Sequence, residues 1–434
     1  MDDRQLFVPQ DGLDGEDYVI ALYSAESASP DLLERAKAIA LEQTVGTWVP
    51  VPEETEEVRA RHSGRVLGVY EIPDYEMELP ASPTRRYVMA IAFPAINFGP
   101  NIPMLLSTTI GNISMIGRLK LLDLIFPPSF LAGFQGPRFG VQGVRELLGV
   151  KERPLLNNMI KPCTGIPPEV GARLFYEAAR GGADIVKDDE LLADAPFSSV
   201  AERVKLFMAM EKRAYEETGE HTLYAVNVTD RVDRLRETAR RAVEGGVNCL
   251  MLNYLTVGID ALRMLAEDPE LGVPILAHLD FAGVLYASCD TGMSSHLVLG
   301  KLPRLAGADV VVFPCAHGKF AIVPEKHRRI ALALTSPLRK IRPAFPMAGG
   351  GVYPGSVPQL MRDLGNDCVL GAGGAIHGHP QGPAAGARAM RQAIDATLAS
   401  RPLSEAAKEH PELAAALAAW GVLEAESPAL YSIK

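Results

Sequence analysis

The sequence predicts an α/β protein in which a (β/α)8 TIM barrel follows a smaller α+β domain of ferredoxin-like type. From residue 155 onward, apolar strands alternate eight times with helices, which is the pattern of a TIM barrel. Before residue 125, one strand and one helix precede further strands without such a repeat, which is typical of an α+β domain. We place the domains at residues 1–132 and 133–434, because a segment punctuated by proline and glycine lies between them.

The N-terminal domain begins with a strand at residues 17–24, where apolar and polar residues alternate. An amphipathic helix is predicted at residues 31–43, because Ser29-Pro30 precedes it as a start signal. Three more segments have the composition of strands: residues 45–51, 64–72 and 85–94.

The C-terminal domain contains eight apolar strand segments: residues 155–162, 183–188, 223–229, 247–253, 274–280, 309–314, 344–351 and 368–374. A helix is predicted after each: residues 167–180, 200–217, 230–244, 258–266, 294–305, 324–334, 357–363 and 383–398. The tail, residues 404–420, predicts one more helix with a role in packing or assembly. In a TIM barrel the chemistry lies at the carboxyl ends of the strands, and the motifs described below fall there.

The composition excludes several classes of function. A net charge of -10 argues against nucleic acid or an anionic membrane as a partner, since both require a basic surface. The five cysteines form no CxxC pair, which favours a reducing cytosol. The N-terminus has neither a basic region nor an apolar run, so we expect no signal peptide, no membrane span and a cytoplasmic protein.

The segment from Gly181 to Glu190, GGADIVKDDE, places four charged residues at the end of a buried strand. Such charges are costly unless they are paired or bind a metal. Alternation along the strand directs Lys187 and Asp189 to one face and Asp188 and Glu190 to the other. The turn after the strand can return Glu190 to the first face.

This cluster has two interpretations. Its carboxylates suit a hard cation such as Mg2+, but a protonated lysine beside the cation would be repelled. Lys187 would fit if it reacted with CO2 to form a carbamate, which is an anionic oxygen ligand. The alternative is a solvated acidic loop without function.

Ile160-Lys161-Pro162 lies one helix upstream of the KDDE motif, and together the two motifs resemble the signature of the RuBisCO large-chain superfamily. The resemblance extends from Glu42 to Gly382 and identifies the chain as a RuBisCO-like protein, the non-carboxylating form IV. It implies Mg2+ held by carbamylated Lys187, Asp189 and Glu190. It also implies a role for Lys161 in proton transfer.

Three departures from the carboxylase pattern bear on the substrate. Cys163 stands where carboxylases carry a second lysine. His278 lies close to a family histidine that touches substrate oxygens, but the arginine after it is replaced by Leu279 or Asp280. Val312 stands in place of a phosphate-binding histidine, so we expect a substrate with one phosphate group.

The other phosphate site of the family is retained. The resemblance assigns it to two glycine loops and two N-terminal residues: Gly349, Gly350, Gly351, Gly373, Gly374, Thr47 and Trp48. Glu42 would help to close the site, and Asn112 would reach the metal region from a neighbouring subunit. We therefore expect a homodimer or a higher oligomer with shared active sites.

Lys319 falls on the lysine of the mobile loop of carboxylases, which contacts the carboxylate being added to the substrate. The alternative is an exposed loop lysine without function. The methionine-salvage enolases of the superfamily, by their pattern, lack this lysine and carry one near Asn112 instead. Lys319 and Asn112 therefore both differ from the residues of those enolases.

These residues lead to one main hypothesis and two alternatives. The main hypothesis is a lyase of carbohydrate-acid metabolism that decarboxylates a sugar-acid monophosphate of the 3-oxo-isoapionate 4-phosphate type through a metal-stabilised enediolate. The first alternative is a 2,3-diketo-5-methylthiopentyl-1-phosphate enolase or thio-sugar phosphate isomerase of methionine salvage. The second is a catalytically silent regulator that binds a metabolite, although a silent site has no reason to keep the costly KDDE cluster.

Overall fold

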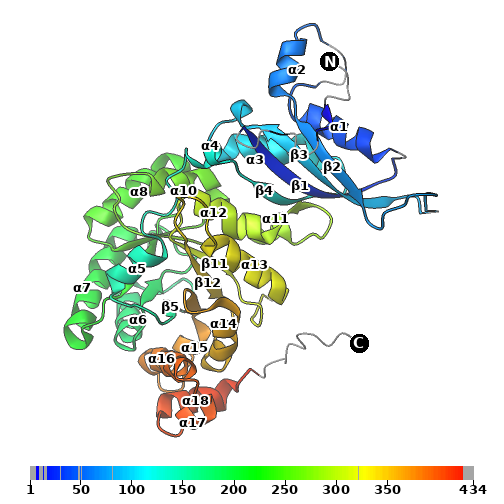
Figure 1. Cartoon of the computed structure of the whole chain (residues 1–434). Coiled ribbons are helices and arrows are strands. Elements are labelled where there is room, and N and C mark those ends of the chain that lie inside the picture. Colours follow the sequence, from blue (N-terminus) through cyan, green and yellow to red (C-terminus); the bar gives the residue numbers. More distant parts are fainter. Residues whose placement is uncertain are drawn as a thin grey trace. The chain divides into compact units, whose positions relative to one another are not determined.

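The computed structural model describes residues 6–8, 13, 17–29, 31–46, 49, 51–80, 82–320 and 322–423. The chain divides into two compact units, and Figure 1 labels many of their elements. The first unit contains Met1–Gly136, Phe281–Ala306 and Pro337–Ile341, and the second contains the rest. Each unit takes up segments from distant parts of the chain, so the limits 1–132 and 133–434 stay a prediction.

The first unit is built on a five-stranded sheet with strand order β10-β4-β1-β3-β2. β1 pairs antiparallel with β3 and β4, and the short β10 adds a parallel edge. Its strands are β1 (Tyr18–Ser27), β2 (Arg65–Glu71), β3 (Arg85–Pro94), β4 (Leu119–Ile125) and β10 (Gly292–Met293). Its helices are α1 (Leu32–Glu42), α2 (Glu56–His62), α3 (Ile102–Ile110), α4 (Pro128–Leu131), α11 (Ala282–Tyr286) and α12 (Leu302–Leu305), with short turns at η3 (Ala95–Asn97), η4 (Asn112–Met115) and η5 (Leu297–Lys301).

The first strand and helix form for the reasons predicted. Residues of β1 alternate between buried and half-buried positions, so one face of the strand packs on the core. Asp31 caps α1, because its carboxylate accepts hydrogen bonds from the backbone N–H groups of Leu33 and Glu34 at 2.9 and 3.0 Å.

The strand predicted at residues 45–51 is wrong for the residues that the structure describes there. The backbone N–H groups of Thr44 and Gly46 both donate to the carbonyl of Leu41, at 3.0 and 2.8 Å. The chain therefore turns back onto the end of α1, and its donors bond helix carbonyls instead of a neighbouring strand. Thr47 and Trp48 lie outside the described residues.

The second unit is a closed barrel of eight parallel strands, in the order β11-β12-β13-β5-β6-β7-β8-β9, which confirms the predicted TIM barrel. The strands are β5 (Leu155–Met159), β6 (Ile185–Lys187), β7 (Leu223–Asn227), β8 (Cys249–Leu252), β9 (Ile275–Ala277), β11 (Val310–Pro314), β12 (Phe345–Gly349) and β13 (Val369–Ala372). The helices are α5 (Gly140–Leu148), α6 (Pro168–Arg180), α7 (Val200–Thr218), α8 (Val232–Glu244), α9 (Tyr254–Val257), α10 (Ile259–Ala266), α13 (Pro324–Thr335), α14 (Val357–Leu364), α15 (Gly374–His377), α16 (Pro383–Leu398), α17 (Leu403–Ala406) and α18 (Pro411–Trp420), with the turn η6 (Pro354–Ser356).

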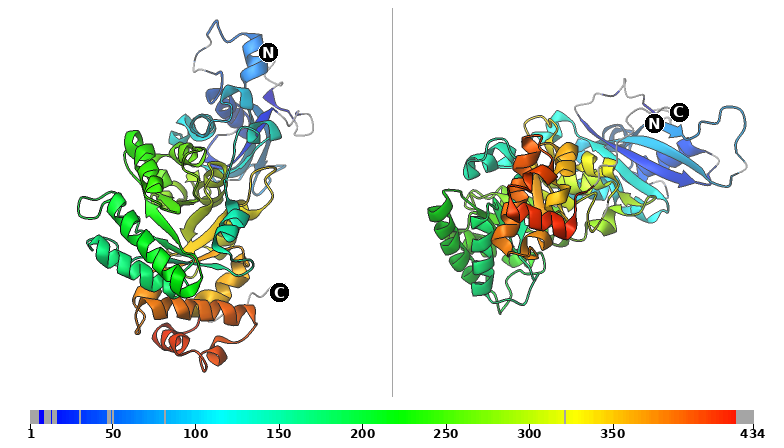
Figure 2. Two further views of the ribbon diagram at one scale, coloured as in Figure 1. Left: turned by 90° about the vertical axis from the view of Figure 1, so that its left-hand side faces the viewer. Right: turned by 90° about the horizontal axis from the view of Figure 1, so that it is seen from below.

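The single helix predicted at residues 404–420 is two helices, α17 and α18. The break occurs at His410, which is extended with φ -121° and ψ 96°. Pro411 disfavours a helical conformation in the residue before it and then begins α18. Figure 2 shows α16 to α18, in orange and red, packed together at one end of the barrel unit.

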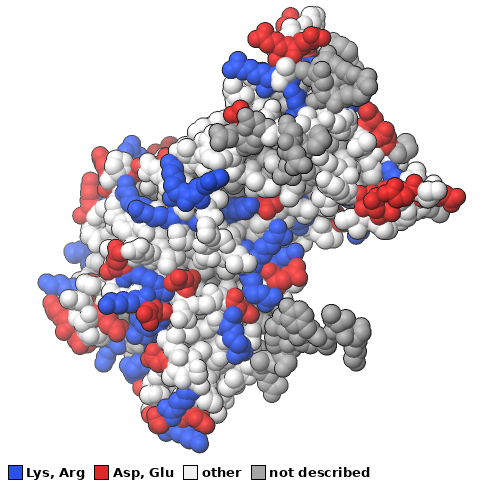
Figure 3. Space-filling model, viewed as in Figure 1, with Lys and Arg blue, Asp and Glu red and all other residues white. Residues whose placement is uncertain are grey.

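The interior of the barrel is filled by apolar side chains contributed by its strands, among them Leu155, Ile185, Met251 and Phe345. A filled barrel leaves space for a ligand only at its ends. Acidic and basic residues are interspersed over the face shown in Figure 3. Within the described part of the chain, none of the helices has both the length and the apolar character needed to cross a bilayer.

Candidate active site

A cavity of about 640 Å³ opens at the carboxyl ends of the barrel strands. Most of the predicted site residues on the barrel line it: Lys161, Glu190, His278, Lys319, Gly349, Gly350, Gly351, Gly373 and Gly374. They come from the last residue of β12 and from the segments that follow β5, β6, β9, β11, β12 and β13. The barrel therefore gathers these residues from positions more than 200 apart in the sequence.

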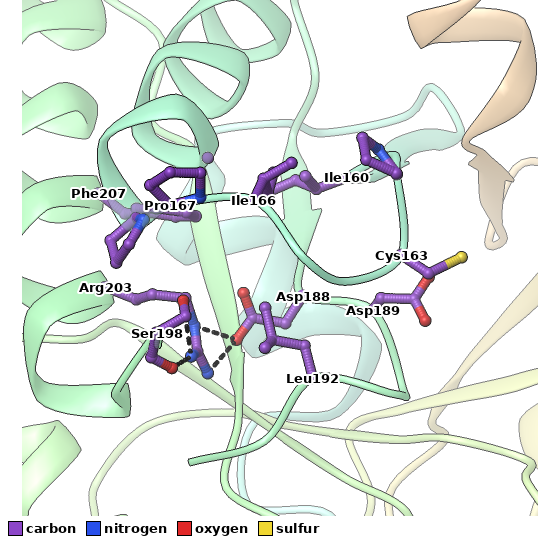
Figure 4. A pocket seen from close by; sticks show the side chains of 13 residues that line it. Ile160, Cys163, Ile166, Pro167, Asp188, Asp189, Leu192, Ser198, Arg203 and Phe207 are labelled. Carbon is purple, nitrogen blue, oxygen red and sulfur yellow. Dashed lines mark hydrogen bonds and ion pairs between the residues drawn. The ribbon is translucent and has the colours of Figure 1, made fainter. Parts of the chain in front are cut away.

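The charged residues at the end of β6 divide into two groups. Lys187 is fully buried, and its Nζ donates to Glu190 Oε2 at 2.9 Å, so the turn returns Glu190 to the face of Lys187 as predicted. Asp189 is also buried and forms an ion pair with Lys161, whose Nζ lies 2.5 Å from its Oδ2. Asp188 turns away from both, towards Arg203 (Figure 4).

Asp188 holds the strand in place and does not face the cavity. One of its oxygens accepts from Arg203 Nη2 at 3.1 Å, and the other accepts from the hydroxyl of Tyr224 at 2.8 Å. The backbone N–H of Asn227 donates to Asp188 as well, at 3.0 Å. Both ionic side chains are 1% exposed, so this pair is fully buried.

Lys161 lies between a carboxylate and a thiol. Its Nζ contacts Asp189 and also lies 3.1 Å from the sulfur of Cys163. Burial alone would lower the pKa of Lys161, but the hydrogen bonds to Asp189 and Cys163 outweigh burial and raise it. Lys161 is therefore an ammonium ion while Asp189 is its partner.

His278 completes the charged side of the cavity. Its Nε2 lies 3.4 Å from Glu190 Oε2, and its Nδ1 lies 3.0 Å from Asp280 Oδ2. Burial, and after it the nearby charge of Lys187, lower the pKa of His278 below its ordinary value. The ring is therefore neutral at neutral pH, and the contact with Asp280 fixes its orientation.

The ion pair of Glu190 predicts a specific dependence of stability on pH. Burial alone would raise the pKa of Glu190, but Lys187, together with His278 and a backbone hydrogen bond, outweighs burial and lowers it from 4.5 to about 2. A carboxylate with a lowered pKa stabilises the fold above its unfolded-state pKa, and this contribution disappears as the pH falls towards the folded-state pKa.

We therefore expect the stability difference between the wild type and Glu190→Gln to shrink by about 3 kcal/mol between roughly pH 5 and pH 2. Urea unfolding at a series of pH values measures this difference. Glu216→Gln, at an exposed position of α7, serves as the matched control. A difference that does not change with pH would contradict the assigned ion pair.

Sequence reasoning missed two asparagines that support the loop after β6. Asn227 ends β7, and Asn253 directly follows β8. Their side-chain amides donate to the backbone carbonyl of Glu190, at 3.3 and 3.0 Å. A polar residue at the end of a buried strand was the available signal for both.

The glycine loops form the side of the cavity next to Lys319. Gly351 has φ +98°, and a Cβ added to it would lie 2.7 Å from the backbone nitrogen of Lys319. Only glycine therefore permits this close approach. The backbone N–H of Lys319 also donates to the carbonyl of Gly350 at 2.8 Å, so the two loops hold each other.

The wall between these groups is apolar. Met159, Leu279 and Val312 line the cavity from β5, the segment after β9 and β11. Trp420, at the end of α18, lines the cavity as well. The tail therefore packs on the barrel unit, as predicted, and in addition contributes one side chain to the wall of the cavity.

Four predicted site residues belong to the N-terminal part of the chain and not to the barrel: Glu42, Thr47, Trp48 and Asn112. Glu42 is the last residue of α1, and Asn112 begins η4; both are exposed and belong to the first unit. Gln43, beside Glu42, donates to the carbonyl of Thr108 at 2.7 Å and so ties α1 to α3. Thr47 and Trp48 lie outside the described residues.

The side chains at the end of β6 supply only part of a ligand set for a divalent cation. Among the described residues, no three His, Cys, Asp or Glu side chains are arranged to hold a metal ion. Asp189 and Glu190 supply carboxylates side by side, each with a lysine as its present partner. The set fits Mg2+ if Lys187 carries a carbamate, because the carbamate adds a third anionic oxygen ligand.

Comparison with known families matches both parts of the chain. The model for the ribulose bisphosphate carboxylase large chain, catalytic domain, matches residues 140–420. The model for the N-terminal domain of the same large chain matches residues 7–130.

Two curated relatives are similar over most of their length. A "ribulose bisphosphate carboxylase-like protein" of Archaeoglobus fulgidus is 54% identical over 390 residues, which cover 89% of each chain. A "2,3-diketo-5-methylthiopentyl-1-phosphate enolase" of Geobacillus thermodenitrificans is 42% identical over 411 residues, which cover 94% of this chain and 99% of the relative.

Solved structures give the same result. A RuBisCO-like protein (MtnW) of Alicyclobacillus acidocaldarius is 39% identical with a TM-score of 0.87, and the match covers 93% of this chain and all of that one. A dimeric archaeal RuBisCO of Hyperthermus butylicus is 33% identical with a TM-score of 0.85, covering 96% of this chain and 99% of that chain. Homologues of this chain are thus known as oligomers.

Proposed function

Because the chain belongs to the ribulose bisphosphate carboxylase large-chain family, as a RuBisCO-like protein, we propose that it enolises a phosphorylated diketone. The substrate would be of the 2,3-diketo-5-methylthiopentyl-1-phosphate type, which was the first alternative drawn from the sequence. The names of the relatives support this alternative better than the decarboxylase hypothesis.

The observation that carries the proposal is the chemical contrast within one cavity. Glycine loops on one side suit a single phosphate group, because backbone N–H groups can approach an anion there. Leu279 and Val312 supply apolar surface where carboxylases, by the resemblance, bind a second phosphate. A monophosphate with an apolar methylthio end matches both sides, and a bisphosphate does not.

Lys187, Asp189 and Glu190 would hold Mg2+, with Lys187 as its carbamate. When bound, the cation supplies positive charge that stabilises negative charge developing on the carbonyl oxygens of the substrate. Asn227 and Asn253 keep the backbone of Glu190 in place through its carbonyl. Arg203 does the same for the end of β6 through Asp188.

Lys161 is the residue that we propose as the base. It lines the cavity and pairs with Asp189. The lysine that the methionine-salvage enolases carry near Asn112 is not found at this position of the chain, so it cannot serve as the base here. With Asp189 engaged as a metal ligand, the hydrogen bond to Asp189 that raises the pKa of Lys161 would be lost, and burial, which lowers this pKa, would favour the neutral amine.

The neutral amine then removes a proton from a carbon next to the diketone. The electron pair left on that carbon forms the carbon–carbon double bond of the enol, and the carbonyl oxygen takes up a proton. His278, oriented by Asp280, is placed to bond a substrate oxygen. The decrease in diketone absorbance with time measures this reaction. Full activity in Lys161→Ala would contradict the role of Lys161 as the base.

Decarboxylation of a β-keto acid monophosphate remains a second candidate, because Lys319 lines the same cavity. In that reaction Lys319 would orient the departing carboxylate. The diketone has no carboxylate, so we expect Lys319→Met to lower enolisation much less than it lowers any CO2 release.

Both activities should be measured on wild type, Lys319→Met and the exposed control Lys326→Met. Our proposal predicts that the enzyme enolises the diketone phosphate and releases no CO2 from 3-oxo-isoapionate 4-phosphate. Metal-dependent CO2 release that falls on the order of 10²-fold in Lys319→Met, the scale of losing one electrostatic group, would establish the decarboxylase instead.

The oligomeric state is also a proposal. By the family resemblance, Glu42 and Asn112 of one copy complete the site of a second copy, so the smallest active unit would be a homodimer. Light scattering at assay concentration tests this, and an active monomer would contradict it.

A further inference from the structure

Helix α18, which carries Trp420 to the cavity, is anchored at its start and directly after its end. The first anchor joins α18 to α16: the carboxylate of Glu412 accepts from Arg388 Nε and from Gln392 Nε2, both at 3.0 Å. The backbone N–H of Leu413 donates in return to Gln392 Oε1 at 3.1 Å. Leu413 and Ala416 are buried, so this face of α18 is packed.

The second anchor follows α18 directly. The backbone N–H of Leu423 donates to the carbonyl of Gly355 at 3.0 Å. A Cβ added to Gly355 would lie 2.1 Å from the carbonyl oxygen of Gly421, so only glycine permits this contact. Gly355 belongs to η6, which follows the glycine loop of β12.

Trp420 lies between these anchors, and its surroundings fix where it is. It is half-buried, lines the cavity with Tyr353 and Gly374, and its ring centroid lies 6.3 Å from that of His379. His379 is itself held, because its Nε2 lies 3.0 Å from the carbonyl oxygen of Glu412. An anchored indole in a cavity wall presents a large apolar face and one N–H donor.

We propose that Trp420 contacts the substrate beside the glycine loops and determines which phosphate esters the cavity accepts. This inference rests on the proposed function, since it assumes a phosphorylated substrate held by those loops. Trp420 is thus a specificity-determining residue supplied by the tail of the chain.

Steady-state kinetics separate this role from a purely structural one. Trp420→Ala should raise the KM for the diketone phosphate on the order of tenfold with little change in kcat, the scale of losing a large apolar contact in a pocket. Trp420→Phe should restore most of the affinity.

Gly355→Ala should raise KM in the same direction, because the added methyl group displaces Gly421 and with it the end of α18. Ala419→Ser, at an exposed position next to Trp420, should leave both constants unchanged. A loss of kcat with unchanged KM in Trp420→Ala, or an equal effect of Ala419→Ser, would overturn the inference.

Fluorescence provides a readout that does not depend on turnover. The sequence has two tryptophans, Trp48 and Trp420, so the part of an emission change that is missing in Trp420→Phe belongs to Trp420. Titration of the wild type with inorganic phosphate in the presence of Mg2+ should change the emission, with the same midpoint that calorimetry measures for phosphate binding, and Trp420→Phe should lose much of this change. An equal emission change in Trp420→Phe, or flat emission of the wild type despite calorimetric binding, would overturn the role of Trp420 alone, whereas no binding to the wild type would overturn the proposed phosphate site and this inference together.

Discussion

Lys187→Ala is expected to abolish metal-dependent turnover, with a loss on the order of 10³-fold or more, because in the proposed function Lys187 is a ligand of the cation that stabilises charge on the substrate. Lys187 is fully buried, and its Nζ lies 2.9 Å from Glu190. Only as a carbamate can this lysine join two carboxylates around a cation. Wild-type activity should therefore also rise after incubation with CO2 and Mg2+.

Two controls accompany this variant. Lys212→Ala removes an exposed lysine of α7 and should retain full activity. Labelled CO2 should give a carbamate carbon signal by NMR in the wild type that is missing in Lys187→Ala. Full metal-dependent activity in Lys187→Ala would show that the site works without this ligand.

Arg203→Met is expected to destabilise the protein by about 3–5 kcal/mol, the typical result of removing one partner of a buried ion pair. Arg203 and Asp188 are both 1% exposed, so Arg203→Met would leave Asp188 buried without its cationic partner. Arg203 also donates to the carbonyl of Ala193 at 3.0 Å and to that of Ser198, so it supports the loop between β6 and α7. Urea unfolding measures the loss.

The double variant Asp188→Asn/Arg203→Met should recover part of this stability, since it leaves no unpaired charge. Arg213→Met, on the same helix with a side chain that is 58% exposed, should have little effect. A loss in Arg203→Met no larger than in Arg213→Met would contradict the structural role of the pair.

Much of the fold could be predicted from the sequence. Parallel barrel strands are buried on both faces, so they appear as short apolar runs between helices, and all eight were identified. The errors arose where local geometry decides: Gly46 turns the chain back onto α1, and Pro411 divides the tail into two helices. Neither effect changes the pattern of apolar residues.

The candidate site was predicted less completely, for physical reasons. The charge cluster at the end of one buried strand indicated Lys187 and Glu190, because such charges need a partner. Lys161 was indicated only by the family resemblance. The partner of Asp188 could not be identified, since Arg203 lies within a helix and meets Asp188 only through tertiary packing. Trp420 has no chemical pattern in the sequence, and only the anchoring of α18 brings it to the cavity.

The most direct test of the central claim is proton exchange on the substrate itself. The enzyme is incubated in D2O with 2,3-diketo-5-methylthiopentyl-1-phosphate, and deuterium at the carbons beside the diketone is followed by NMR. We predict exchange and enol formation that require Mg2+ and CO2 and are lost in Lys187→Ala and Lys161→Ala. Absence of exchange in the fully activated wild type, or equal exchange in both variants, would contradict the assignment of an enolising active site.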